Sequence, residues 1–172
     1  SFGVASAILS SAVFDLALWL ARRKDMQHLY AALASLFAAL FSASGAIQLS
    51  FDPSPINLFF ERMEFASLLL LASTSAAFAL SINHRRVLPW LAPLMSINAV
   101  FIALLFATDL VVSPHYVLRN LLTATMPEPI PGPLAPIMFL FGLSTSYLTI
   151  SNFLHFAKGK PRTQTMLIVG ST

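Results

Sequence analysis

Five apolar runs, each close to the thickness of a lipid bilayer, follow one another along this chain. A helix that crosses a bilayer needs about 20 predominantly apolar residues. We predict five such helices, at residues 2–21, 28–49, 58–82, 88–108 and 136–157. A sixth apolar run begins at about residue 164 and is not completed. The prediction is therefore an all-α, polytopic transmembrane helix bundle with five spanning helices and an incomplete sixth.

Basic residues gather in three clusters between these runs, and they contain eight of the ten Lys and Arg residues of the chain. The clusters are Arg22-Arg23-Lys24, Arg85-Arg86, and Lys158 with Lys160 and Arg162. Loops on the cytoplasmic side of a membrane are enriched in Lys and Arg. Because a basic cluster occurs at every second connection, we predict that the N-terminus lies outside the cell.

The composition agrees with burial in lipid. The chain is 57% hydrophobic and only 10% charged, whereas a soluble domain has about 25% charged residues. The cytoplasmic loops account for the basic pI of 9.7, so we predict no nucleic-acid partner. The chain has no cysteine, which excludes disulfides, thiolate catalysis and cysteine-based metal sites.

The first apolar run does not resemble a cleaved signal peptide. A signal peptide carries basic residues before a shorter apolar core, whereas Arg22 follows this run. The sequence starts at Ser1, and its sixth apolar run stops at Thr172. A helix that ended inside lipid would leave unpaired carbonyl groups. We therefore expect this chain to be part of a longer protein.

The two connections on the predicted outer side differ in length. Residues 51–57 form a short turn that contains two prolines. Residues 109–135 form a longer connection, with prolines at positions 114, 127, 129, 131 and 133. We expect residues 115–122 to form a short helix at the membrane interface, followed by a stiff, extended strap. Long ordered loops are often functional, so a ligand could act here.

Asp15, Asn98 and Asn152 are candidate polar residues within the membrane. Asp15 lies seven positions before Arg22, which is about 10 Å along a helix and places it in the inner leaflet. An ionised carboxylate there is costly and should face the bundle. Asp15 is either a proton or ligand switch or a structural hydrogen-bond partner of Asn152, and we favour the structural interpretation.

Four polar residues near the predicted outer end are candidate ligand-binding residues: Gln48, Glu61, Arg62 and Glu64. Acidic residues near a helix N-terminus are stabilised by the helix dipole alone. Arg62 could anchor an anionic ligand or form a salt bridge with Asp52. We favour helix capping and a salt bridge, and we keep ligand binding as the alternative.

Small and hydroxyl side chains gather at residues 42–46 and 73–77. Small residues let helices approach closely, and hydroxyl groups can bond between helices. We interpret these segments as packing surfaces, with a ligand cavity as the alternative.

The sequence carries no pattern that indicates a cofactor. His28, His84 and His155 fall at the predicted inner ends of helices, whereas a b-type haem needs paired histidines at one depth within the membrane. The sequence contains no HExxH motif, P-loop or Ser-His-Asp order. We predict no cofactor, no metal and no catalytic residue.

Two short motifs contain an arginine, Phe60-x-Arg62-x-x-Phe65 and Arg162-x-Gln164. They resemble parts of the seven-helix sensor region at the N-terminus of many bacterial histidine kinases and diguanylate cyclases. Phe60-x-Arg62-x-x-Phe65, within residues 58–66, is similar to the F-x-R-x-x-Y/F entry to that family's third helix. Arg162-x-Gln164, followed by residues 166–170, is similar to the entry to its sixth helix. The resemblance implies a sensing module without catalytic residues. It also implies two more helices and a cytoplasmic kinase or cyclase after Thr172.

We therefore expect a non-catalytic sensor domain in the bacterial inner membrane, in which a ligand at the outer half shifts helix packing between two states. The alternative is a structural or accessory subunit of a respiratory or photosynthetic complex, because 15 Phe residues suit packing against other subunits or in a homodimer. A small transporter is the third candidate. It would need a polar path at the midplane, which only Asp15, Asn98 and Asn152 could provide.

Overall fold

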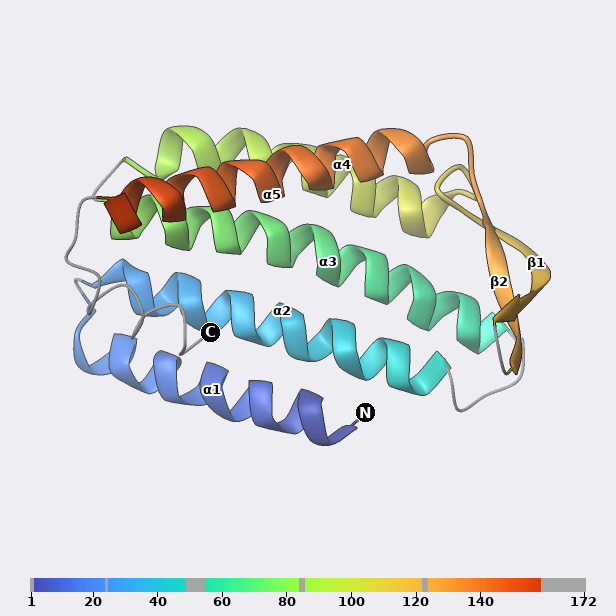
Figure 1. Cartoon of the computed structure of the whole chain (residues 1–172), viewed down its shortest axis with the longest axis horizontal. Helices are drawn as coiled ribbons and strands as arrows, with labels where there is room; N and C mark the ends of the chain where they lie inside the picture. Colours follow the sequence, from blue (N-terminus) through green and yellow to red (C-terminus); the bar gives the residue numbers. More distant parts are fainter. Residues whose placement is uncertain (1, 24, 49–54, 84–85, 122–123, 159–172) are drawn as a thin grey trace.

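In the part of the chain that the structure describes, five helices run along the long axis of the molecule, and a β-hairpin lies at one end (Figure 1). The computed structural model describes residues 2–23, 25–48, 55–83, 86–121 and 124–158. The elements are α1 (Phe2–Ala21), α2 (Met26–Gln48), α3 (Pro55–Ile82), α4 (Leu88–Ala107), β1 (Val112–Leu121), β2 (Ala124–Pro131) and α5 (Ala135–Lys158). The prediction of an all-α bundle is confirmed. The predicted start of a sixth helix lies outside the described residues.

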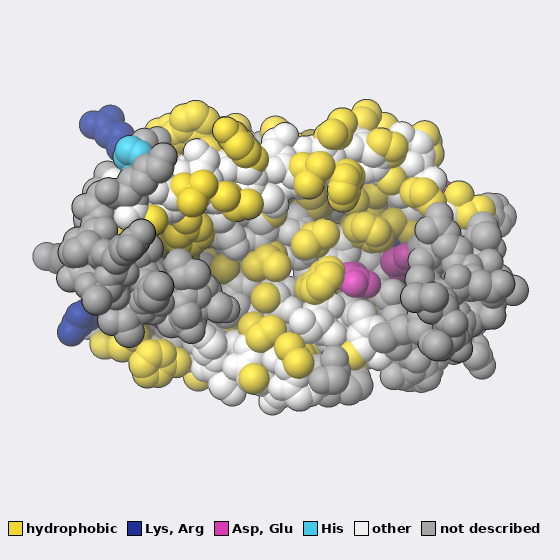
Figure 2. All heavy atoms as spheres, in the orientation of Figure 1, with side chains coloured by type: hydrophobic (Ala, Val, Ile, Leu, Met, Phe, Trp, Pro, Cys, Tyr) yellow, Lys and Arg dark blue, Asp and Glu magenta, His cyan; other side chains and the backbone are white. Residues whose placement is uncertain are grey.

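All five helices are long and apolar enough to cross a membrane. Their apolar spans have 19 to 26 residues and a mean hydropathy of 1.4 to 2.0. The bundle buries 56% of the α3 span but only 11–17% of each other span, so most of the apolar surface faces outward. Figure 2 shows this apolar surface on one face of the molecule. The described part of the chain is therefore a multi-pass transmembrane bundle.

Helix α3 is the centre of the bundle. It packs against α2, α4 and α5, and α1 packs against α2. Small residues line its contact faces, and Ser73, Ala76, Ala77 and Ala79 are at most 1% exposed. Small side chains allow neighbouring helices to approach α3 closely, which agrees with the packing interpretation of residues 73–77.

The base of the hairpin belongs to the core. Val111 and Val112 are buried, and they pack in a cluster with residues of α3, α4 and α5. The two ends of the hairpin are joined by a 2.9 Å hydrogen bond from the amide of Gly132 to the carbonyl oxygen of Val111. A Cβ atom at Gly132 would lie 2.2 Å from the carbonyl oxygen of Leu110. Only glycine therefore fits at this crossing of the chain.

The expected helix over residues 115–122 is wrong, because this segment belongs largely to β1. The strands pair in antiparallel register, with Val117 opposite Glu128. The strap is extended as expected, but it is one strand of a hairpin. Backbone N–H groups of a strand point alternately to its two edges. The prolines at 127, 129 and 131 occupy alternate positions, so their backbone nitrogens, which carry no hydrogen, can all point to the free edge. No hydrogen bond between the two strands is then lost.

Candidate functional site

The four predicted ligand-binding residues lie at the end of the bundle that carries the hairpin, which we call the hairpin end. Gln48 is the last residue of α2, and Glu61, Arg62 and Glu64 belong to the second and third turns of α3. Because α3 begins at Pro55, its first turn contains no acidic residue. The effect of the helix dipole is confined to the first turn. The expected capping role of Glu61 and Glu64 is therefore wrong.

A polar contact joins α2 to α3 at the hairpin end. The side-chain amide of Gln48 donates a 2.7 Å hydrogen bond to Oε2 of Glu64. One turn earlier in α2, a Cβ atom at Gly45 would lie 3.4 Å from the other carboxylate oxygen of Glu64. A glycine at this position lets the α2 backbone approach the carboxylate closely.

Arg62 joins α3 to the end of α4. Its NH2 group lies 2.7 Å from Oδ1 of Asp109, and its NH1 group donates a 3.2 Å hydrogen bond to the carbonyl oxygen of Phe106. The side chain of Arg62 is 13% exposed, whereas that of Asp109 is 63% exposed. Arg62 therefore forms a salt bridge with Asp109. The expected partner, Asp52, lies outside the described residues, so that pairing stays a prediction. The buried Nε atom of Arg62 makes no hydrogen bond with any residue that the structure describes.

Glu61 lies beside these contacts. It is 7% exposed, and no hydrogen bond or ion pair joins its carboxylate to another described residue. It is close enough to Glu64 and Arg62 to interact with both electrostatically. Figure 2 shows acidic side chains near the hairpin, on a face that is otherwise largely apolar.

Asp15 contacts His28 of α2 and not Asn152, so the expected partner is wrong. Oδ1 of Asp15 lies 3.3 Å from Nδ1 of His28, and Nε2 of the same ring lies 3.9 Å from Oδ2 of Asp25. The reason is helix order: α1 packs on α2, whereas α5 packs on α3. Two residues at equal depth in the membrane can belong to helices that do not meet.

Asn98 and Asn152 serve other helix contacts. Asn98 is fully buried, and its Nδ2 atom donates hydrogen bonds to Oγ of Ser73 at 2.8 Å and to the carbonyl oxygen of Leu69 at 3.2 Å. The carbonyl oxygen of Asn152 accepts a 2.9 Å hydrogen bond from Asn83 at the end of α3. Asp15, Asn98 and Asn152 therefore stand at three different helix contacts, with no contact among them.

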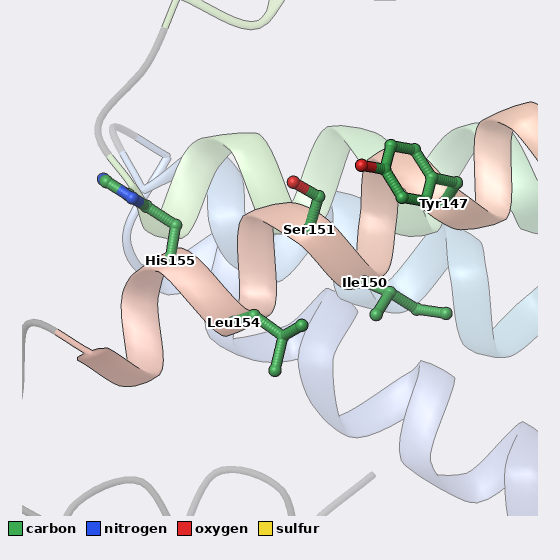
Figure 3. Close-up of a pocket in the computed structure, with 5 residues that line it drawn as sticks. All are labelled: Tyr147, Ile150, Ser151, Leu154 and His155. Carbon is green, nitrogen blue, oxygen red and sulfur yellow. The ribbon is translucent and has the colours of Figure 1, made fainter.

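A shallow hollow lies on the exposed face of α5. It is lined by Tyr147, Ile150, Ser151, Leu154 and His155. Figure 3 shows Tyr147, Ser151 and His155 on one side of the helix and Ile150 and Leu154 on the other. All five residues belong to one helix, so within the described residues this hollow is a surface feature of α5.

The described residues contain no group of three or more His, Cys, Asp or Glu side chains that could hold a metal ion. No protein-family model, characterised protein or solved structure matches this chain. The sequence interpretation missed Asp109, which completes the contacts of Arg62. The sequence feature that could have indicated Asp109 is its position directly after an apolar run.

Proposed function

We propose that this chain is a sensor and signal-transducing domain of the bacterial inner membrane, without catalytic activity of its own. Its hairpin lies on the outer side of that membrane. The motif resemblance at Phe60, Arg62 and Phe65 supports this function. The charge distribution supports the orientation, because the exposed residues Arg22, Arg23 and Arg86 belong to the α1–α2 and α3–α4 connections. Figure 2 shows Lys and Arg side chains at the end away from the hairpin.

The contact between Arg62 and Asp109 is the observation that carries the proposal. Arg62 belongs to the central helix, which packs against three of the other four helices. Asp109 lies where α4 leads into the hairpin. A ligand that displaced the hairpin would therefore act on α3 through this pair, and α3 would pass the displacement to its neighbours. Such a ligand shifts the equilibrium only by its difference in affinity for the two arrangements.

The orientation can be tested by thiol labelling, because the chain has no cysteine. We would introduce single cysteines by Ile130→Cys in the hairpin and by Arg23→Cys at the opposite end. A membrane-impermeant maleimide should label the first variant in intact cells and the second only after permeabilisation. The reverse pattern would contradict the proposed orientation.

Signalling can be tested on the natural gene product. We expect the gene to continue beyond Thr172 into a kinase or cyclase, and an open reading frame that ends within a few residues of it would refute the proposal. In membrane vesicles, Arg62→Gln should change the kinase or cyclase output. Arg23→Gln, which removes an exposed cation at the opposite end, is the matched control. Equal output from the Arg62→Gln variant and the unmodified protein would also count against the proposal.

A second candidate is an accessory subunit of a larger membrane complex. The exposed face of α5 favours it, because Tyr147 is 74% exposed and lies beside the exposed hydroxyl group of Ser151. Polar side chains on a spanning helix are better accommodated against another helix than against lipid. Co-purification from native membranes at a fixed stoichiometry would support this candidate, and an isolated, monodisperse chain would count against it.

A further inference from the structure

The hollow on the exposed face of α5 has a polar side and an apolar side. Its volume is about 280 Å³, close to the lower limit of about 300 Å³ for ligand pockets. Figure 3 shows the polar side chains of Tyr147, Ser151 and His155 along one side of the helix, and Ile150 and Leu154 along the other. An occupant that fits both sides is amphiphilic, with polar groups along one side and a hydrocarbon part along the other.

The polar side of the hollow has hydrogen-bond donors without partners. No hydrogen bond joins the hydroxyl groups of Tyr147 and Ser151 or the ring of His155 to another described residue. The hydroxyl groups of Ser144 and Thr149, by contrast, each donate to a carbonyl oxygen four residues earlier in α5. Within the apolar span of α5, no water compensates an unpaired hydroxyl group. The hollow therefore suits an occupant with acceptor oxygen atoms.

A cation lies near the end of the hollow that contains His155. The side-chain amide of Asn83 donates a 2.9 Å hydrogen bond to the carbonyl oxygen of Asn152, which joins the end of α3 to α5. Arg86, which is exposed, follows Asn83 by three residues, and His155 follows Asn152 by three residues. Figure 2 shows a His side chain together with a Lys or Arg side chain at this end of the bundle. The polar side of the hollow therefore leads to a positive charge.

The positive charge on this side of the bundle has no nearby carboxylate in the same stretch of sequence. Residues 65–172 contain two acidic residues, Asp109 and Glu128, and both belong to the hairpin end. The two basic clusters of the same stretch, at 85–86 and 158–162, contain five Lys and Arg residues. This difference follows from the sequence alone, so it includes the side chains that the structure does not describe. Charge complementarity therefore favours an anionic occupant.

We infer that the hollow of α5 binds one anionic phospholipid, with its phosphate at Arg86 and His155 and one acyl chain along the apolar side. Guanidinium and imidazole N–H groups both donate to phosphate oxygen atoms. The two hydroxyl groups of the hollow lie deeper in the membrane, where the ester oxygens of a phospholipid can accept their hydrogen bonds. Basic pockets between helices on the cytoplasmic side of a membrane bind the headgroups of anionic lipids in this way.

The binding of this lipid does not rest on the proposed function. The lipid belongs to the inner leaflet only under the proposed orientation, but its retention is measured in detergent, where no orientation is needed. A chain that retains the lipid and transmits no signal would refute the proposed function and leave the site intact. A chain that signals without retaining the lipid would do the reverse.

The test is native mass spectrometry of the purified chain in detergent, with equal amounts of phosphatidylglycerol and phosphatidylcholine that carry the same acyl chains. We expect the chain to retain one phosphatidylglycerol with at least about fivefold preference, since one basic residue near an anionic headgroup contributes about this factor. Glycerol 3-phosphate has the negative charge without the acyl chains. At the concentration of the lipid, it should not displace phosphatidylglycerol.

Two pairs of variants separate this site from a general attraction of anionic lipids. Arg86→Gln should lower the preference about fivefold, whereas Arg23→Gln, which removes an exposed cation directly before Lys24 and Asp25, should leave it unchanged. Ser151→Phe should fill the hollow and abolish retention. Ser144→Phe is the matched control, because it makes the same change at an exposed position of α5 outside the hollow.

Four results would overturn the inference. Equal retention of the two lipids would show that the charge has no effect, and displacement by glycerol 3-phosphate would show a site for the anion alone. Equal retention by the Ser151→Phe and Ser144→Phe variants would show that the hollow does not hold the lipid. Crosslinking of a Ser151→Cys variant to another protein in native membranes would assign the hollow to a protein partner.

Discussion

The hydrogen bond between Asn98 of α4 and Ser73 of α3 allows a quantitative test of how these helices are held together. Both side chains are 0% exposed, and the donor and acceptor atoms lie 2.8 Å apart. Single substitutions would not isolate this bond. Asn98→Ala also removes the bond to Leu69 and the buried Oδ1 atom, which has no hydrogen-bond partner in the described part of the chain. Removing such an unsatisfied buried group stabilises a protein by about 1–3 kcal/mol. The net change in the free energy of unfolding could therefore have either sign.

A double-mutant cycle with Asn98→Ala and Ser73→Ala removes these other effects from the comparison. Hydrogen bonds between transmembrane helices average about 0.6 kcal/mol and reach about 1.7 kcal/mol. The full burial and short distance place this bond in the upper part of that range. We expect a coupling free energy of about 1 kcal/mol, which is about fivefold in the unfolding equilibrium constant.

The cycle is measured by reversible unfolding of the four proteins in mixed micelles. Ser96→Ala combined with Asn98→Ala is the control, because the hydroxyl of Ser96 bonds within its own helix, to the carbonyl oxygen of Ala92. Its coupling should be close to zero. A coupling below about 0.3 kcal/mol between Asn98 and Ser73 lies within ordinary additivity and would refute the bond as a stabilising contact.

Two further predictions concern the hairpin end. Gly132→Ala should destabilise the protein by about 1–3 kcal/mol through steric overpacking, since its Cβ atom would meet the backbone of Leu110. Gly142→Ala, where a Cβ atom meets nothing within 4 Å, should instead stabilise α5 by about 0.5–1 kcal/mol, and equal unfolding free energies for the two variants would contradict the packing described. Asp109→Asn should cost at most about 1 kcal/mol, because the carboxylate is largely exposed and screened by water. The difference should shrink as salt is added, and a larger, salt-independent loss would show that the pair is shielded from water.

The sequence predicted the spanning helices well, because a membrane fixes both the length and the polarity of a helix that crosses it. The observed ends of these helices differ from the predicted ends by up to three residues, and one such difference changed the interpretation of Glu61 and Glu64. With α3 starting at Pro55, Glu61 became a residue of the second turn. The hairpin was missed because β pairing depends on residues that are distant in sequence, and its prolines suggested an unpaired strap. Their alternation at 127, 129 and 131 was the available signal.

The contacts of the polar residues could not be predicted from depth in the membrane. Depth follows from the number of residues between a side chain and the end of its helix, which the sequence gives directly. A contact also depends on which helices are neighbours and on how each is rotated about its axis. This explains why Asp15 was assigned to Asn152 of α5, whereas it contacts His28 of α2. The pairing of Arg62 with Asp109 required the same missing information.

The contacts of α3 at the hairpin end also impose an order on the synthesis of the protein. Gln48, the partner of Glu64, precedes it by 16 residues, whereas Asp109, the partner of Arg62, follows it by 47 residues. A ribosome that has just released α3 has therefore already supplied one partner and has yet to make the other. The guanidinium group of Arg62 cannot pair with Asp109 until α4 has been inserted and the residues after it have emerged from the ribosome. The hairpin end is thus completed by the second half of the chain, and a nascent chain arrested within α4 would carry an arginine in its central helix without its carboxylate.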